Sequence, residues 1–524
     1  MAAIVTDQFR ILNANNFVDS VLNTNNSYYT FLGLVNSNGS NNFGRKTNWD
    51  TNTPNPTDNF QYSSHYKETA LFGKKIKSSD IRRVVRRVNW VVNTSYDMYR
   101  HDYSVDKPTP NSNSSRLYDS NYYVINSEFK VYICLDNGSY GESGSTTSKG
   151  KRSEDEPTFT DLEPTSAGTS NDGYIWKYLF TISPSDIIKF DSTEYIVLPN
   201  NWSTSSDIQV TNVRESANSD LNFNQIRKVY IEKSGLNYSQ GTHVLDILGD
   251  GSGGRVSVTV NSNGEIIDTD VVSGGSGYTY GVVDLGSIQP GILPENDKAK
   301  LIPIIPPSKG HGYDLYTELG ADKVLIYNRF DDSNNDFPTD TNFSQVGILK
   351  NPQYYSSETI FNENQFSSLH SIMLSGVDDS FNPTIGENIS QVVTGGTAKG
   401  YVASYDKKTK VLKYSTDRSL YFKNGVNQTD AGDVSSYSKV LEFSSSIGNN
   451  ITFETSSLSA SIDTFSGIAK TVGNELVDLG VNFTNGLANP EINRKTGDLI
   501  YIDNRTLINR DLRQKEDVKI ILEF

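Results

Sequence analysis

Apolar and polar residues alternate strictly near the C-terminus of the sequence. Val518, Ile520 and Leu522 recur at every second position, which is the period of a strand with one buried face. Residues 497–505, which precede a charged connection, are also typical of a strand. We therefore predict that two strands end this sequence and that residues 518–524 are tied into a sheet.

In two further segments apolar residues recur at every second position, and one of these segments is apolar on both faces. Residues 127–135 place apolar side chains on one face only. In residues 174–182 aromatic residues such as Trp176 alternate, while Ile175 and Leu179 occupy the opposite face. These aromatic residues could instead form a platform on which glycans stack. Large apolar side chains on both faces of the strand, however, favour a buried core strand.

A helix is predicted near the N-terminus. Residues 4–22 carry apolar residues at mixed three- and four-residue spacing, and Thr6 or Asp7 is a suitable N-terminal cap. The expected apolar face consists of Val5, Phe9, Leu12, Phe17 and Val21.

A second helix is predicted over residues 81–90, capped by residues 78–80. Its valines at 84, 85 and 88 would point inward and its arginines outward. This stretch belongs to the strongest basic cluster of the chain, and we weigh a docking face for an acidic partner against a merely solvated helix face. Nucleic-acid binding is disfavoured because aromatic residues are not interleaved with the charges. The cluster comprises Lys74, Lys75, Lys77, Arg82, Arg83, Arg86 and Arg87.

Two segments have the patterns of small β modules. Ser234-Gly235 is matched 42 residues later by Ser276-Gly277, and Asn263-Gly264 between them is a strong hairpin turn. Short apolar runs separated by Gly and Lys turns follow residue 386, which predicts a second small barrel or sandwich.

Composition narrows the functional classes. The 524 residues carry a formal net charge of −15, which argues against nucleic-acid binding. Cys134 is the single cysteine and is expected to be a buried apolar residue, and the five histidines are not spaced as metal ligands. The sequence contains no apolar run of transmembrane length and no pattern typical of a signal peptide. We therefore expect no catalytic residues, cofactor or metal, and no membrane insertion.

Several motifs, in the same order along the chain, resemble a known family: the small dimeric wedge subunit of the contractile-tail baseplate of T-even-type phages. Residues 172–180 (DGYIWKYLF) give the most specific match, and residues 497–505 (GDLIYIDNR) resemble the C-terminal strand of that family. The other matching positions are residues 3–6, 9–10, 16–17, 56–58, 131–136 (VYICLD), 194–199, 343, 345, 348 and 351–352.

The resemblance implies a structural virion protein that is not an enzyme. It implies a homodimer that contacts other baseplate wedge subunits, assembles in the host cytoplasm and rearranges when the tail sheath contracts. We expect a mainly β fold with a discontinuous β-sandwich-like core, a few flanking helices and two inserted small β modules. The expected segments are core residues 1–206, 313–374 and 487–524, with insertions at 207–312 and 375–486.

A function from another class is kept as the alternative. Virion proteins and secreted glycan-binding proteins share a composition rich in Asn, Ser, Thr, Gly and Tyr. A glycan-binding or glycan-cleaving tail protein that acts on the host surface would therefore have a similar sequence. Affinity of the isolated chain for capsular or lipopolysaccharide preparations would distinguish it from a wedge subunit.

Overall fold

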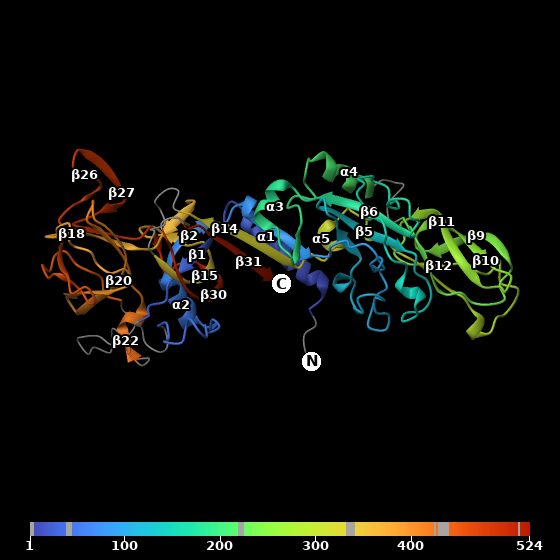
Figure 1. Cartoon of the computed structure of the whole chain (residues 1–524), viewed down its shortest axis with the longest axis horizontal. Coiled ribbons are helices and arrows are strands. Elements are labelled where there is room, and N and C mark those ends of the chain that lie inside the picture. Colours follow the sequence, from blue (N-terminus) through green and yellow to red (C-terminus); the bar gives the residue numbers. More distant parts are fainter. Residues whose placement is uncertain are drawn as a thin grey trace. The chain divides into compact units, whose positions relative to one another are not determined.

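The fold is mainly β, as predicted. Strands contain 38% of the residues of this computed structural model and helices 13%. Two compact units, each built from separate parts of the sequence, make up the chain (Figure 1). Unit 1 comprises Met1–Val18, Arg82–Leu325 and Ile521–Phe524, and unit 2 comprises Asp19–Ile81 and Ile326–Ile520. The structure describes residues 5–37, 44–217, 225–331, 341–423, 426–427, 440–511 and 514–524.

A three-stranded antiparallel sheet with strand order β4-β5-β6 forms the aromatic core of unit 1. Cys134 lies opposite Trp176 in the β5–β6 ladder, and both side chains are fully buried. The predictions of a buried cysteine and of a core strand over residues 174–182 are confirmed, and the glycan-stacking alternative for this strand is wrong. The elements are β4 (Tyr123–Ile125), β5 (Lys130–Asn137), β6 (Tyr174–Thr181), β7 (Tyr195–Val197), α3 (Pro184–Phe190), α4 (Ile208–Ala217) and α5 (Leu315–Glu318).

The N-terminal helix α1 (Asp7–Leu22) forms as predicted, but its buried face is different. The Phe9 amide donates to the hydroxyl of Thr6 at 3.3 Å, so Thr6 caps the helix. The predicted inward residues Val5, Phe9 and Leu12 are about half exposed. Of the predicted face, Val21 is buried as expected, and it shares the buried stripe with Ile11, Ala14 and Val18.

The predicted helix over residues 81–90 does not form. A strand, β3 (Ile81–Arg86), takes its place and pairs with β7, with Val84 opposite Val197. Valines at 84 and 85 fit a helix by spacing alone, but β-branched side chains favour an extended backbone when a partner strand is available. The capping segment forms a separate short 3₁₀ helix, η1 (Ser78–Asp80).

The first β module within unit 1 has its own apolar core. Its four antiparallel strands follow the order β11-β10-β9-β12 (Figure 1), and a second ladder joins β8 to β13. Gly264 adopts a positive φ of 76° in the predicted hairpin turn. The two repeated glycines, Gly235 and Gly277, share a positive φ, but the buried tyrosines that follow them, Tyr238 and Tyr278, stand at different offsets. The strands are β8 (Val229–Lys233), β9 (Gly241–Gly249), β10 (Ser252–Val260), β11 (Ile266–Ser276), β12 (Gly281–Val283) and β13 (Lys300–Pro303).

Unit 2 contains a five-stranded sheet with the order β17-β2-β1-β15-β30. Gln345 of β15 is fully buried and links neighbouring elements through its amide. The amide oxygen accepts a hydrogen bond from Thr69 at 2.8 Å, and the amide nitrogen donates to Asn504 at 2.8 Å. Such pairing satisfies a buried polar group without water. The elements are β1 (Tyr28–Gly33), α2 (Phe60–Thr69), β2 (Ala70–Lys75), β15 (Asn342–Lys350), β17 (Gln365–Ser367) and β30 (Asp498–Asn509).

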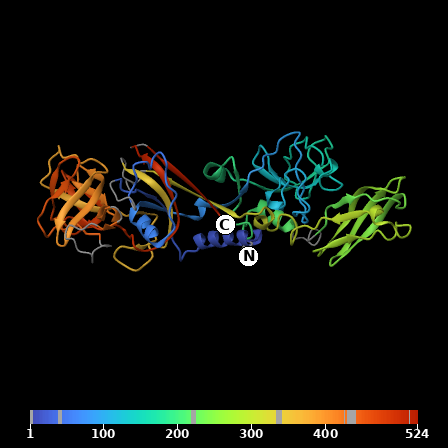
Figure 2. The same cartoon turned by 90° about the horizontal axis from the view of Figure 1, so that it is seen from below.

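The second β module, in unit 2, is a closed six-stranded barrel, one of the two architectures predicted for it. Its strand order is β21-β20-β19-β24-β25-β18, and pairing of β18 with β21 closes the ring (Figure 2). Side chains such as Ile372, Leu412 and Ile451 fill its core. Its first strand begins at His370, before residue 375, where the sequence-based boundary falls. The strands are β18 (His370–Ser375), β19 (Asn388–Val393), β20 (Gly396–Asp406), β21 (Val411–Ser415), β24 (Ile451–Phe453) and β25 (Ser459–Ile462).

Short ladders complete the strands of unit 2. The hairpin of β26 and β27 packs its apolar side chains, including Phe483, against Met373 of the barrel strand β18. The remaining strands are β16 (Gln353–Tyr354), β22 (Phe422–Lys423), β23 (Val426–Asn427), β26 (Gly467–Val472), β27 (Glu475–Phe483), β28 (Leu487–Ala488) and β29 (Ile492–Asn493).

The C-terminal strand has the predicted alternation. In β31 (Glu516–Glu523), which neighbours β14 (Lys323–Phe330), Ile520 is 5% exposed and Ile521 is 38% exposed. We expect Ile520→Asp to lower the free energy of unfolding by at least about 3 kcal/mol, because it buries a carboxylate at an apolar position.

The matched control is Ile521→Asp, which makes the same chemical change at an exposed position and should cost about 1 kcal/mol or less. Urea unfolding followed by circular dichroism measures both changes. Equal losses of unfolding free energy in the two variants would contradict the assignment of Ile520 to the buried face and Ile521 to the exposed face of β31.

Charged side chains join the first β module to the rest of unit 1. Arg100 donates to both carboxylate oxygens of Asp102 at 2.9 and 2.8 Å, and its guanidinium lies 4.0 Å from the ring centre of Tyr230 in β8. Lys107 bridges Asp102 and Glu232. Burial alone would raise the pKa of Asp102, but the Arg100 hydrogen bonds and the charges of Arg100 and Lys107 outweigh it and lower the pKa to about 2.

This pKa predicts a pH-dependent stability. A lowered carboxyl pKa stabilises the fold fully above the ordinary value near 3.8, and the stabilisation is lost as the pH falls towards 2. Asp102→Asn should therefore cost about 2 kcal/mol at pH 6, and the difference from the parent should shrink as the pH approaches 2. Urea unfolding at both pH values measures it, and an unchanged difference would show that the ion pair does not stabilise the fold.

Candidate functional site: a charged pocket beside strand β3

The seven basic residues that the sequence predicted as one docking face divide between the two units. Three lysines lie on β2 or just after it in unit 2, and four arginines lie on β3 or just after it in unit 1. Lys74 donates to the Arg329 carbonyl at 2.6 Å, and Lys75 donates to the Asn362 carbonyl at 3.2 Å. The cluster is therefore not a continuous helix face, and each arginine has its own environment.

Two of the arginines are engaged inside unit 1. Arg83 is 4% exposed; its Nε donates to Asn15 of α1 at 2.5 Å, and its guanidinium lies 4.2 Å from the ring centre of Tyr316. Arg82 forms a 2.8 Å ion pair with Asp186 of α3. Such contacts compensate the desolvation of a guanidinium group when it is removed from water. Both residues therefore have a structural role.

The other two arginines differ from this pair, because Arg86 is itself exposed and the partner of Arg87 is half exposed. Arg87 forms a 3.0 Å ion pair with the half-exposed Asp191. Arg86 is exposed, and its Nη2 donates to the carbonyl oxygens of Asp119 and Ser120 and to the side chain of Asn121, at 2.8 to 3.3 Å. Arg86 lines a pocket, and this pocket is the best candidate for a functional site on β3.

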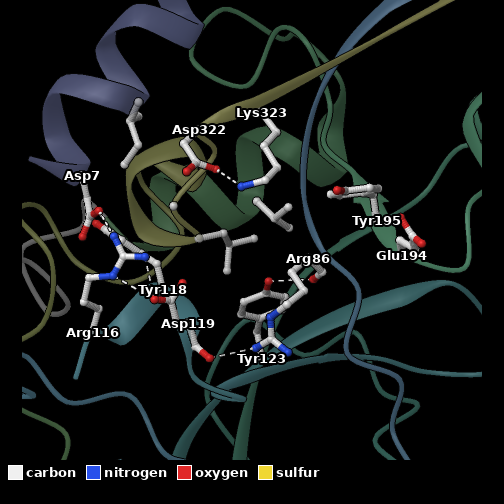
Figure 3. Close-up of a pocket in the computed structure, with 14 residues that line it drawn as sticks. Asp7, Arg86, Arg116, Tyr118, Asp119, Tyr123, Glu194, Tyr195, Asp322 and Lys323 are labelled. Atoms are coloured by element: carbon white, nitrogen blue, oxygen red, sulfur yellow. Dashed lines mark hydrogen bonds and ion pairs between the residues drawn. The ribbon is translucent and has the colours of Figure 1, made fainter. Parts of the chain in front are cut away.

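The pocket has a volume of about 250 Å³, with apolar side chains at its centre and charged side chains around them (Figure 3). Segments far apart in the sequence build it: α1, β3, the 3₁₀ turn η2 (Leu117–Asp119), β4, β7 and the start of β14. The lining residues are Asp7, Ile11, Val85, Arg86, Arg116, Tyr118, Asp119, Tyr123, Glu194, Tyr195, Leu319, Gly320, Asp322 and Lys323.

Two cations of the pocket each lie between two carboxylates. Arg116 pairs with Asp7 at 2.8 Å and with Asp119 at 2.6 Å (Figure 3). These hydrogen bonds and charges raise the pKa of Arg116.

Lys323 pairs with Asp322 at 2.9 Å and with Glu523 at 3.3 Å. Burial alone would lower the pKa of Lys323, but hydrogen bonds and charges from both carboxylates raise it. Both cations thus stay charged, and each group of three has one carboxylate in excess.

Tyrosines form part of the pocket wall. Tyr123 is fully buried, and its hydroxyl donates to the Arg86 carbonyl at 2.7 Å. Burial, together with the nearby Asp7 charge, raises the pKa of Tyr118 to about 12. The Tyr118 phenol therefore stays neutral near pH 7 and offers a ring face rather than a charge.

The arrangement offers charged groups, aliphatic surface and rings that can bind a side chain. The pocket contains no serine, cysteine or histidine. Among the residues that the structure describes, no group of three or more His, Cys, Asp or Glu is placed to hold a metal ion. Within the same residues, no helix is both long and apolar enough to cross a membrane.

Sequence reasoning identified Arg86 but missed the rest of the pocket. Asp7, Arg116 and Lys323 are isolated charged residues in three separate segments, and nothing in the local sequence sets them apart from other surface charges. Only the tertiary fold brings them together, so a single sequence carries no signal for this site.

The environments of Arg83 and Arg87 predict opposite mutational effects. Arg83→Gln should lower the free energy of unfolding by about 2–4 kcal/mol, because it removes a buried charged hydrogen bond and a desolvated ring contact. Arg87→Gln is the matched control and should cost about 0–1 kcal/mol, since its partner is half exposed. Thermal and urea unfolding measure both, and equal effects would refute the assignment of Arg83 as a structural residue.

Comparison of the sequence with protein-family models and with curated proteins finds no match. The function must therefore be argued from the residues and the geometry of this chain.

Proposed function

We propose that this chain is a structural virion protein, a subunit of the baseplate wedge of a contractile phage tail. The observation that carries the proposal is that sequence segments resembling the wedge family are hydrogen-bonded neighbours in space. One pair consists of consecutive strands, and the members of the other pair lie far apart in the sequence. Consecutive strands often pair, so the pairing of the two distant segments is the stronger support, because chance matches along 524 residues have no reason to meet across that separation.

One such pair lies in unit 1. The segment VYICLD is in β5 and the segment DGYIWKYLF leads into and fills β6. The two strands form an antiparallel ladder in which Ile133 lies opposite Lys177. The most specific match thus belongs to the centre of an aromatic core, where packing restricts residue choice most strongly.

A second pair lies in unit 2. The matching positions around Gln345 are in β15, and the segment GDLIYIDNR leads into β30. These strands are also antiparallel neighbours, with Ile348 opposite Tyr501. The stretches without a match contain the four-stranded module of unit 1 and most of the barrel of unit 2, each with its own apolar core. This distribution supports a family core that carries two additions.

The proposed work is assembly. A wedge subunit acts by binding its own copy and other wedge subunits, and it needs specific surfaces rather than catalytic groups. The pocket beside β3 supports this role because it combines an apolar centre with a charged rim, as the anchor pockets of interfaces do. We place the assembled protein in the virion tail after assembly in the host cytoplasm.

Antibody labelling of purified tailed particles tests the proposal. An antibody against the barrel module should decorate the baseplate end of intact tails in negative-stain electron microscopy, in a sixfold arrangement. An antibody against an unrelated protein of the same host is the control and should decorate nothing.

Absence of the chain from purified particles would refute the virion role. Label on fibres, together with binding of the isolated chain to capsular or lipopolysaccharide preparations, would favour the glycan-binding alternative instead.

A further inference from the structure

We propose that the pocket beside β3 accepts a basic side chain, arginine or lysine, from a segment of a partner protein. The sequence alone suggested the reverse, an acidic partner docking on the arginines of this stretch. The inference rests on the proposed docking role of the chain and adds to it the chemistry of the partner. It follows from the charge balance of the pocket, its apolar centre and its size.

The charge balance leaves negative charge in excess. Four carboxylates and three cations line the pocket, and Glu523 adds a further carboxylate through Lys323. Glu194 is the one charged side chain of the lining whose charged group has neither a hydrogen bond nor an ion pair within the part of the chain that the structure describes. A basic group that enters the pocket beside Glu194 would gain this carboxylate as a partner, on the side of the pocket away from Arg116 (Figure 3).

Arg86 does not reverse this balance. Its guanidinium already donates three hydrogen bonds to neutral oxygen atoms, so its charge is solvated by the protein. An acidic side chain that approached Arg86 would also meet the carboxylate of Asp119 and those of Asp7 and Asp322. Like charges that meet at an interface oppose binding, so an acidic occupant is disfavoured.

The centre of the pocket suits the stem of a basic side chain. Ile11, Val85 and Leu319 contribute aliphatic surface to the lining. Tyr118 and Tyr195 add rings to it (Figure 3). Arginine and lysine place their methylene groups on apolar surface while the charged end stays polar, and both are attracted to ring faces.

The size of the pocket also favours a side chain over a free ligand. Its volume of about 250 Å³ is below the range of about 300–1,000 Å³ that is usual for small-molecule sites. The net charge of −15 would in addition steer a basic partner segment towards this chain.

Binding of short peptides to the full chain tests the inference. The probe is a fluorescently labelled pentapeptide with a central arginine between two leucines, and its matched controls carry citrulline or glutamate at the centre. Citrulline keeps the shape of arginine and lacks its charge. Fluorescence anisotropy should show that the arginine peptide binds at least about threefold more tightly than either control.

Two paired variants locate the binding. The double variant Glu194→Gln/Asp322→Asn removes two charges of the pocket. It should weaken binding of the arginine peptide at least about threefold. Asp268→Asn with Asp270→Asn removes two exposed charges of β11 in the same unit and should leave binding unchanged. If the first pair unfolds the chain, Glu194→Gln alone serves, because it removes no side-chain hydrogen bond within the described residues.

Three results would overturn the inference: no difference between the arginine and citrulline peptides, an equal loss in both variant pairs, or tighter binding of the glutamate peptide. The last result would assign the pocket to an acidic partner through Arg86. If the chain binds the arginine peptide but is absent from tail baseplates, the inference about the pocket stands and the proposed function is refuted.

Discussion

Strand β3 carries Arg82 and Arg83 into unit 1, and each of these two guanidinium groups must be surrounded by groups that replace water. An uncompensated buried charge costs several kcal/mol, so the elements around β3 must supply oxygen atoms and rings at fixed places. Arg83 obtains them from Asn15 and Tyr316, and Arg82 obtains them from Asp186. α1, α3 and α5 each supply one group that contacts an arginine of β3.

The same requirement shapes the pocket. Arg86, at the end of β3, is held by the η2 turn and the residues after it, and that turn also brings Asp119 to Arg116. Arg116 in turn holds Asp7 at the start of α1. A chain of charged contacts thus fixes the rim, while Ile11 and Val85 supply the apolar centre. The docking properties of the pocket are a consequence of how the arginines are neutralised.

Alternating patterns of apolar and polar residues identified some of the strands. β31 and β6 were predictable because side-chain direction in a strand follows from position alone, and the barrel was predictable from short apolar runs with Gly and Lys turns. Residues 81–90 were mistaken for a helix because Val84, Val85 and Val88 have helical spacing, whereas pairing with β7 makes residues 81–86 a strand with neighbouring valines buried on both faces. The buried face of α1 depends on which neighbours pack against it, which the sequence does not state.

The pocket was beyond sequence reasoning for a related reason. Its charges come from α1, β3, η2, β7 and β14, and their balance appears only when these elements meet. A basic stretch in the sequence suggested an acidic partner. In the fold, Arg82 and Arg87 form ion pairs within unit 1, Arg86 donates to neutral oxygen atoms, and carboxylates outnumber cations in the pocket lining. Net charge of a segment is therefore a poor guide to the surface it presents once ion pairs have formed.

High-resolution electron microscopy of the assembled tail tests the central claim most directly, because it would show this chain among its neighbours. The account predicts an arginine or lysine of a neighbouring subunit in the pocket, with its charged end near Glu194 and its stem over Ile11 and Val85. A pocket open to solvent in the assembled particle, or an acidic side chain seated on Arg86, would contradict it.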